Sequence, residues 1–171
     1  MKNENEGERM KKNIIRIILS ILLLCTFVLI FGFSSQDGEK SGGISQKITQ
    51  VITSNINSIQ ELEKIEKEEV LNKIEYVVRK LAHFSIYAVV GILLMGLLCT
   101  YEIENNKRIL ITVIVGMLYA VSDEIHQGFI PGRSPQFTDV LIDTFGVITG
   151  ALCSMIILKK RKIYEKKKNS T

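Results

Sequence analysis

Four segments of nearly uninterrupted apolar residues constrain this chain more than any other feature. Hydrophobic residues make up 46% of the 171 residues, and the charges gather at the two ends and between residues 61 and 80. A helix of about 20 apolar residues is long enough to cross the roughly 30 Å of hydrocarbon in a bilayer. Lipid offers no partners to backbone polar groups, so such segments fold as helices. The sequence predicts an all-α membrane protein with four transmembrane helices.

The four predicted spans cover residues 14–33, 81–100, 109–128 and 138–158, within a single membrane domain over residues 1–171. An outer segment at 34–80 and a basic cytoplasmic tail at 159–171 complete the chain. Within the outer segment, Ile, Val and Leu recur at three- and four-residue steps over residues 44–62, and the charged run ELEKIEKEEV continues the pattern. This predicts an extracytoplasmic amphipathic helix between spans one and two, with a solvated spacer as the alternative.

The distribution of Lys and Arg predicts the orientation in the membrane. Five of them lie in the arm up to Arg16, two in the connection at 101–108 and seven in the tail, but Arg133 alone lies between spans three and four. Basic short loops remain on the cytoplasmic side. We therefore expect a multi-pass protein of the cell membrane with both termini in the cytoplasm. The net charge of +4 is then explained by membrane anchoring and does not indicate a nucleic-acid partner.

Ionisable residues in the stretch SDEIHQGFIPGRSPQFTDV, residues 122–140, are predicted to lie at membrane depth. The charge-free part of span three, residues 109–121, covers about two-thirds of the hydrocarbon at 1.5 Å per residue. Asp123 must therefore lie in the outer third of the membrane, and Asp143 falls inside the apolar run of span four. The topology brings seven ionisable residues of three helices and their loop to one height: His83, Asp123, Glu124, His126, Arg133, Asp139 and Asp143.

Helical spacing predicts which of these side chains share a face. Asp123, His126 and Gln127 are three and four residues apart, so they are expected on one face of span three. Glu124 lies on a different face and is expected to point toward lipid headgroups. An ionisable group in a membrane is costly and persists where it pairs with another group or with a bound partner.

Two further patterns concern the loop and the packing of span four. The turn predicted at PGR would let Arg133 fold back and pair with Asp139 or Asp143. Gly146 and Gly150 form a small-x-x-x-small pattern, which lets membrane helices approach closely. We therefore expect these glycines to form a packing face below the polar residues.

The stretches RKLAHFSIYAVVGILL (79–94), DEIHQGFIPGRSPQFTDVLIDTFGVITG (123–150) and FSSQ (33–36) resemble the VanZ-like family of small bacterial membrane proteins. The order and spacing of these motifs agree along nearly the whole chain. Family members often carry a carboxylate just before the tyrosine of the second span, whereas here Ile86 precedes Tyr87. The founding member is associated with resistance to teicoplanin, a lipoglycopeptide. The resemblance therefore implies a cell-envelope context without defining a reaction.

The favoured function is an outward-facing polar site that binds or handles an envelope amphiphile, with a contribution to teicoplanin-type resistance. The partner would be a membrane lipid or a lipid-linked envelope component. The residues predicted to form the site are His83, Tyr87, Asp123, Glu124, His126, Gln127, Arg133, Asp139 and Asp143. Because carboxylates outnumber cationic groups among them, an amine, sugar hydroxyls or a cation would suit the site better than a bare phosphate.

Three alternatives remain open. A metal-dependent hydrolase acting on a lipid headgroup would hold a divalent metal with His83, Asp123, His126 and Asp139. The sequence has no nucleophile pattern and no His-Glu-x-x-His motif, so it does not decide whether the protein is an enzyme. A structural polar network would perform no chemistry. A proton-coupled transporter with only four spans would need a homodimer to enclose a path.

Overall fold

The computed structural model describes residues 2–36, 38–54, 56, 59 and 62–168. Its described secondary structure is entirely helical, which confirms the predicted all-α class. The five helices of this part of the chain are α1 (Lys2–Ser34), α2 (Gly38–Ser54), α4 (Lys64–Leu98), α5 (Asn105–Gln127) and α6 (Phe137–Lys168).

Four helices are long and apolar enough to cross a membrane, as the sequence predicted. These segments are Glu6–Ser34, Lys64–Leu98, Asn105–Gln127 and Phe137–Lys160. Many of their large apolar side chains face outward; Leu24 and Val28 of α1, for example, are 63% and 62% exposed. Such a surface suits lipid, which is as apolar as the side chains themselves. The chain is therefore a multi-pass membrane protein.

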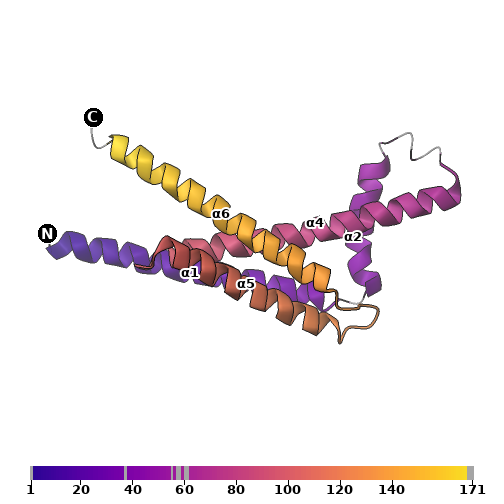
Figure 1. Ribbon diagram of the computed structural model, residues 1–171, viewed down its shortest axis with the longest axis horizontal. Coiled ribbons are helices and arrows are strands. Elements are labelled where there is room, and N and C mark those ends of the chain that lie inside the picture. Colours follow the sequence, from indigo (N-terminus) through magenta and orange to yellow (C-terminus); the bar gives the residue numbers. More distant parts are fainter. Residues whose placement is uncertain (1, 37, 55, 57–58, 60–61, 169–171) are drawn as a thin grey trace.

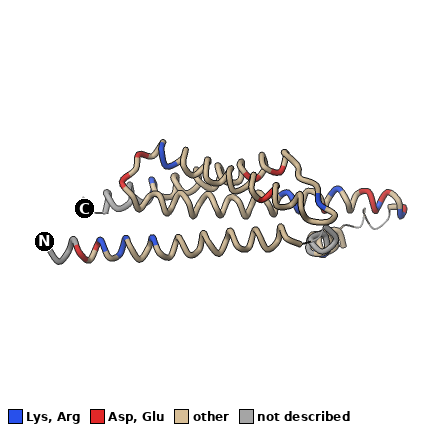
Figure 2. The backbone as a smooth tube through the Cα atoms, turned by 90° about the horizontal axis from the view of Figure 1, so that it is seen from below, with Lys and Arg blue, Asp and Glu red and all other residues tan. Residues whose placement is uncertain are grey.

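The helices form an elongated bundle with both termini at the same end (Figure 1). We call the opposite end, where α1 and α5 finish and α6 begins, the polar end. Helices α4 and α6 run in the same direction and share the most extensive interface of the described structure. Helix α5, which lies between them in the sequence, runs in the opposite direction. In Figure 2 Lys and Arg residues are visible near the end that carries the termini.

Glycines on α4 and α6 allow the backbones of these two helices to touch. A Cβ added to Gly146 would overlap the carbonyl oxygen of Phe84, and one added to Gly150 would overlap that of Ala88. On the α4 side, a Cβ at Gly91 would overlap the carbonyl oxygen of Val147. Contact this close is possible only without side chains, as in other small-x-x-x-small membrane interfaces. It fixes the register in which α6 lies against α4.

The charged run at 64–80 does not continue the outer helix, contrary to the sequence-based expectation. The outer helix α2 ends at Ser54, and Lys64 begins a helix that continues without a break to Leu98. Residues 64–80 are rich in helix-forming Glu and Lys, and the pair Glu69–Lys73 forms a 2.7 Å salt bridge one turn apart. No Gly or Pro interrupts the run before Gly91. The helix of span two therefore starts well before its apolar part.

Helix α2 lies across the first half of α4 (Figure 1). Its polar stripe faces inward: Ser45, Thr49 and Thr53 are buried, and the Ser45 hydroxyl donates a 3.0 Å hydrogen bond to Glu75. Val51 of the apolar stripe predicted from the sequence faces outward and is 68% exposed, whereas Ile48 of the same stripe lines a groove against α1 and α4. The position of α2 along a membrane surface stays a prediction.

Candidate functional site

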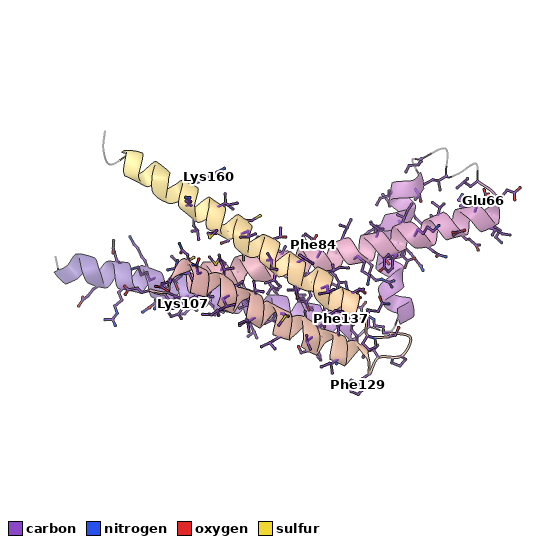
Figure 3. The ribbon with its side chains drawn as sticks, viewed as in Figure 1. Glu66, Phe84, Lys107, Phe129, Phe137 and Lys160 are labelled. Atoms are coloured by element: carbon purple, nitrogen blue, oxygen red, sulfur yellow. The ribbon has the colours of Figure 1, made fainter. Side chains whose placement is uncertain are left out.

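The candidate site lies at the polar end, where α4, α5 and α6 meet below the loop at 128–136. Figure 3 shows Phe129 and Phe137 near the two ends of this loop and Phe84 near the crossing of α4 and α6. The last turns of α1 close one side of the same region, as shown by the hydrogen bond from Arg133 to the Phe33 carbonyl oxygen. Four helices thus contribute to one polar region.

A buried cluster of three side chains forms the centre of this region. His83 comes from α4, Asp123 from α5 and Asp143 from α6, and one ligand atom of each lies within 4.8 Å of the other two. Asp143 is completely buried and Asp123 is 4% exposed. The Nδ1 atom of His83 lies 3.6 Å from Oδ1 of Asp143. The three helices therefore bring these three predicted site residues together, and their depth in a membrane stays a prediction.

The Asp123 carboxylate is oriented by an amide from its own helix. Gln127, one turn later on α5, donates a 2.9 Å hydrogen bond from Nε2 to Oδ2 of Asp123. The same nitrogen lies 3.3 Å from the hydroxyl of Ser34 at the end of α1. Both Gln127 and Ser34 are buried. A chain of polar contacts therefore links α1 to the cluster.

Several buried polar atoms of the site lack a hydrogen-bond partner within the described part of the chain. They are both carboxylate oxygens of Asp143, Nδ1 of His83, the hydroxyl of Tyr87 and Oε1 of Glu124. Buried polar groups in folded proteins nearly always have partners, so each exception calls for an explanation. At this site the exceptions come from the neighbouring helices α4, α5 and α6, which makes it the candidate ligand site of the described structure.

Asp139 and Arg133 do not form the pair expected from the sequence. Asp139 forms a largely buried salt bridge with Lys80 of α4. Arg133 instead donates a 3.2 Å hydrogen bond to the carbonyl oxygen of Phe33 at the end of α1. Burial lowers the pKa of the Arg133 guanidinium, and the charge of Asp123 acts in the opposite direction. The loop thus turns its arginine toward α1 and away from α6.

His126 also lies outside the cluster, although it was expected on the same face as Asp123. Its ring stacks on Phe31 of α1, with centroids 4.4 Å apart and planes inclined by 24°. Its Nε2 atom lies 3.0 Å from the hydroxyl oxygen of Ser35. Of the four proposed metal ligands, the structure therefore brings His83 and Asp123 together and places His126 and Asp139 elsewhere. Asp143 takes its place beside the first two.

Glu124 is buried, which corrects the expectation that it points to lipid headgroups. Its exposed fraction is 4%, and Oε2 accepts a 2.8 Å hydrogen bond from the backbone N–H of Gln136. The loop at 128–136 folds over the end of α5 and supplies this donor. Glu124 therefore anchors the loop to the helix.

A groove of about 290 Å³ adjoins the cluster, between α1, α2 and α4. Six of its twelve lining residues are apolar and six are polar. The lining residues are Ile30, Phe33, Ser34, Gln36, Ser45, Ile48, Val78, Arg79, Ala82, His83, Ile86 and Arg133. His83 belongs to both the groove and the cluster and so connects them.

Lys80 and Arg79 were not predicted as site residues from the sequence. Lys80 precedes His83 by three residues, and Asp139 precedes Asp143 by four. When α4 and α6 are aligned in parallel, Lys80 meets Asp139 in the same register in which His83 meets Asp143. This alignment could have identified the Lys80–Asp139 salt bridge from the sequence. Arg79 lines the groove because α2 and the end of α1 fold against α4, which no local pattern indicates.

The fold and site define an α-helical multi-pass membrane protein with a polar cluster built from three of its spans. The family model described as VanZ/LLP1 matches residues 19–158, so the chain belongs to this family, as its motifs predicted. The match covers all three cluster residues and the groove. No curated protein and no solved structure matches the chain.

Proposed function

We propose that this protein binds an anionic amphiphile of the cell envelope in the groove between α1, α2 and α4. The observation that carries the proposal is the composition of the groove lining. Apolar side chains of three helices lie beside two guanidinium groups, those of Arg79 and Arg133. A molecule with an acyl chain and a negatively charged headgroup matches both halves of this lining.

The apolar half of the groove suits a hydrocarbon chain. Ile30 and Phe33 come from α1, Ile48 from α2, and Val78 and Ile86 from α4. A volume of about 290 Å³ is at the lower limit of small-molecule pockets. It accommodates a headgroup and the adjoining part of a chain, while the rest of the chain can remain in the surrounding lipid.

The polar half of the groove favours an acidic headgroup. A guanidinium group has five N–H donors, so Arg133 retains donors for a ligand besides the one bound to Phe33. Phosphate and carboxylate groups bind arginine through paired hydrogen bonds. This revises the ligand chemistry expected from the sequence, because the carboxylates expected in the pocket are bound elsewhere or lie in the buried cluster.

The proposal includes the envelope location and the teicoplanin-type resistance implied by the resemblance to the VanZ-like family. The Lys and Arg distribution supports a groove that opens on the outer leaflet, with both termini in the cytoplasm. Teicoplanin carries an acyl chain, so the drug and an envelope lipid share the chemistry that the groove selects. We expect a deletion strain to change in teicoplanin susceptibility, and the Arg133→Gln variant to fail to restore it at unchanged protein abundance.

Lipid binding by the purified full-length protein tests the proposal directly. Native mass spectrometry in detergent would compare phosphatidylglycerol with phosphatidylcholine of the same acyl chains. We expect phosphatidylglycerol to bind at least tenfold more tightly, and Arg79→Gln with Arg133→Gln to remove this preference. Arg9→Gln with Lys12→Gln, an equal loss of two exposed cationic side chains at the other end of the bundle, is the matched control and should change nothing.

A second variant tests the apolar half of the groove. Ala82→Phe would place a large side chain in the groove and should weaken binding of both lipids without altering the preference for charge. Equal affinities of the two lipids for the unmodified protein would contradict the proposal. So would an unchanged preference in the arginine double variant.

A further inference from the structure

We infer that His83, Asp123 and Asp143 form a binding site for a divalent transition-metal ion such as zinc or manganese. This inference concerns the buried cluster and does not depend on what binds in the groove. It draws on the positions of the three side chains, on polar atoms that lack partners and on the charge of the cluster.

The distances between the side chains suit a shared ion. A metal held at about 2.0–2.2 Å from each ligand atom separates neighbouring ligands by about 3.0–3.4 Å and opposite ones by about 4.2 Å. The His83 and Asp143 atoms are 3.6 Å apart, and all three ligand atoms fall within 4.8 Å. A direct hydrogen bond between His83 and Asp143 would require a shorter distance. Small side-chain rotations suffice to close the set around an ion.

Asp143 provides an independent indication of a ligand. Its side chain has no exposed surface, yet neither carboxylate oxygen has a hydrogen-bond partner among the described residues. The facing Nδ1 atom of His83 is unpartnered in the same way. A carboxylate so placed in a membrane protein needs a partner. The cluster would supply two oxygen ligands and one nitrogen ligand to an ion between them.

The charge of the cluster also calls for a cation. Two buried carboxylates share a single imidazole, so even a protonated His83, 3.6 Å from Asp143, leaves one negative charge without a counter-charge. Lys80 pairs with Asp139, and Arg133 bonds to Phe33. A water molecule could form hydrogen bonds at this position but would add no positive charge. A divalent cation would coordinate the unpartnered oxygens and also balance the charge.

The ligand types indicate which ion would bind. Imidazole favours zinc and related transition metals, whereas carboxylates are also good ligands for manganese. Three protein ligands leave at least one coordination position open, as in catalytic rather than structural zinc sites. The amide of Gln127 holds Asp123 at 2.9 Å and would act as an outer partner that orients a ligand. His83 also lines the groove, so the open position would be accessible from it.

Metal binding to the purified full-length protein tests the inference. Protein stripped with a chelator would be titrated with Zn²⁺ and Mn²⁺ by calorimetry, and the retained metal measured by mass spectrometry. We expect one ion per chain, and at least a tenfold loss of affinity for Asp143→Asn and for His83→Gln. Asp139→Asn removes another carboxylate of the same helix, one turn away, and should bind metal as the unmodified protein does.

The stability of the metal-free variants separates a metal site from a purely structural network. Asp143→Asn removes one of two buried carboxylates that share a single imidazole, so the metal-free variant should melt at a higher temperature than the metal-free parent and gain nothing from added zinc. A lower melting temperature for Asp143→Asn, together with zinc binding unchanged from the parent, would overturn the inference. Absence of stoichiometric binding by the parent protein at millimolar Zn²⁺ and Mn²⁺ would overturn it as well.

Discussion

Replacing Gly150 with alanine should destabilise the protein by forcing α4 and α6 apart. A Cβ at this position would overlap the carbonyl oxygen of Ala88 and lie 2.8 Å from its carbonyl carbon. Ordinary van der Waals contact for a Cβ begins at 3.4 Å. The obstructing atoms belong to the backbone, so no side-chain rotation can remove the overlap. The two helices must separate at this point.

The size of the effect follows from two opposing contributions. Adding a methyl group to a close-packed contact costs about 1–3 kcal/mol, while alanine regains up to about 1 kcal/mol of helix propensity over glycine. A gap of about 0.5–1 Å forfeits a quarter to a half of each atomic attraction across it. Because α4 and α6 share the most extensive interface, we expect a net loss of about 1–2 kcal/mol in unfolding free energy.

The assay is reversible unfolding in mixed micelles, with Gly96→Ala as the matched control. A Cβ at Gly96 would meet the Leu19 side chain at 3.7 Å, which is an ordinary contact. This variant should therefore be as stable as the parent protein or slightly more stable. Equal unfolding free energies for Gly150→Ala and Gly96→Ala would refute the argument that the backbones of α4 and α6 are in contact.

Three further predictions concern the polar end and the topology. Lys80→Met should lower the unfolding free energy by about 3 kcal/mol, because it leaves Asp139 without its partner, and the double variant Lys80→Met/Asp139→Leu should regain most of this loss. Glu124→Gln weakens the anchor of the 128–136 loop by about 1–2 kcal/mol, seen as faster proteolysis of the loop. In a cysteine-free background, Ser134→Cys should react with an impermeant reagent added to intact cells, and Asn106→Cys should not; the reverse pattern would exclude the expected orientation.

The burial of the cluster could be predicted from the lengths of the apolar runs. The charge-free part of span three is too short to cross the hydrocarbon, so Asp123 was expected among the packed helices, and it is 4% exposed in the structure. Asp143 lies inside an apolar run, and it is completely buried in the structure. The family could also be predicted, because its motifs are contiguous in the sequence.

The exact partners within the cluster could not be predicted, because helical spacing is too coarse for that purpose. Residues three and four positions after Asp123 both count as its neighbours on the helix, yet His126 and Gln127 differ by about 100° around the axis. Gln127 therefore contacts Asp123, whereas His126 turns to Phe31 of α1. The position of α1 beside α5 decides which of the two side chains turns to Asp123. The sequence of α5 alone does not reveal that position.

The loop and the outer segment were beyond sequence reasoning for a different reason. The backbone N–H of Gln136 reaches Glu124 because the loop folds over the end of α5, a path set by tertiary contacts. Helix α4 begins at Lys64, well before its apolar part. Hydropathy marks only the apolar part, so it could not locate the start of the helix. Periodicity indicated the apolar stripe of α2 but not which stripe packs inward.

The attachment of α1 has a consequence for how the site could adapt to its ligand. Most of this helix faces outward, and its buried positions, Thr26, Ile30 and Ser34, follow one narrow stripe. Ile30 and Ser34 also line the groove. This wall of the groove is therefore held by a narrower buried stripe than the wall formed by α4, which is in backbone contact with α6. We expect a wider ligand to displace α1 before it displaces His83 or Asp143.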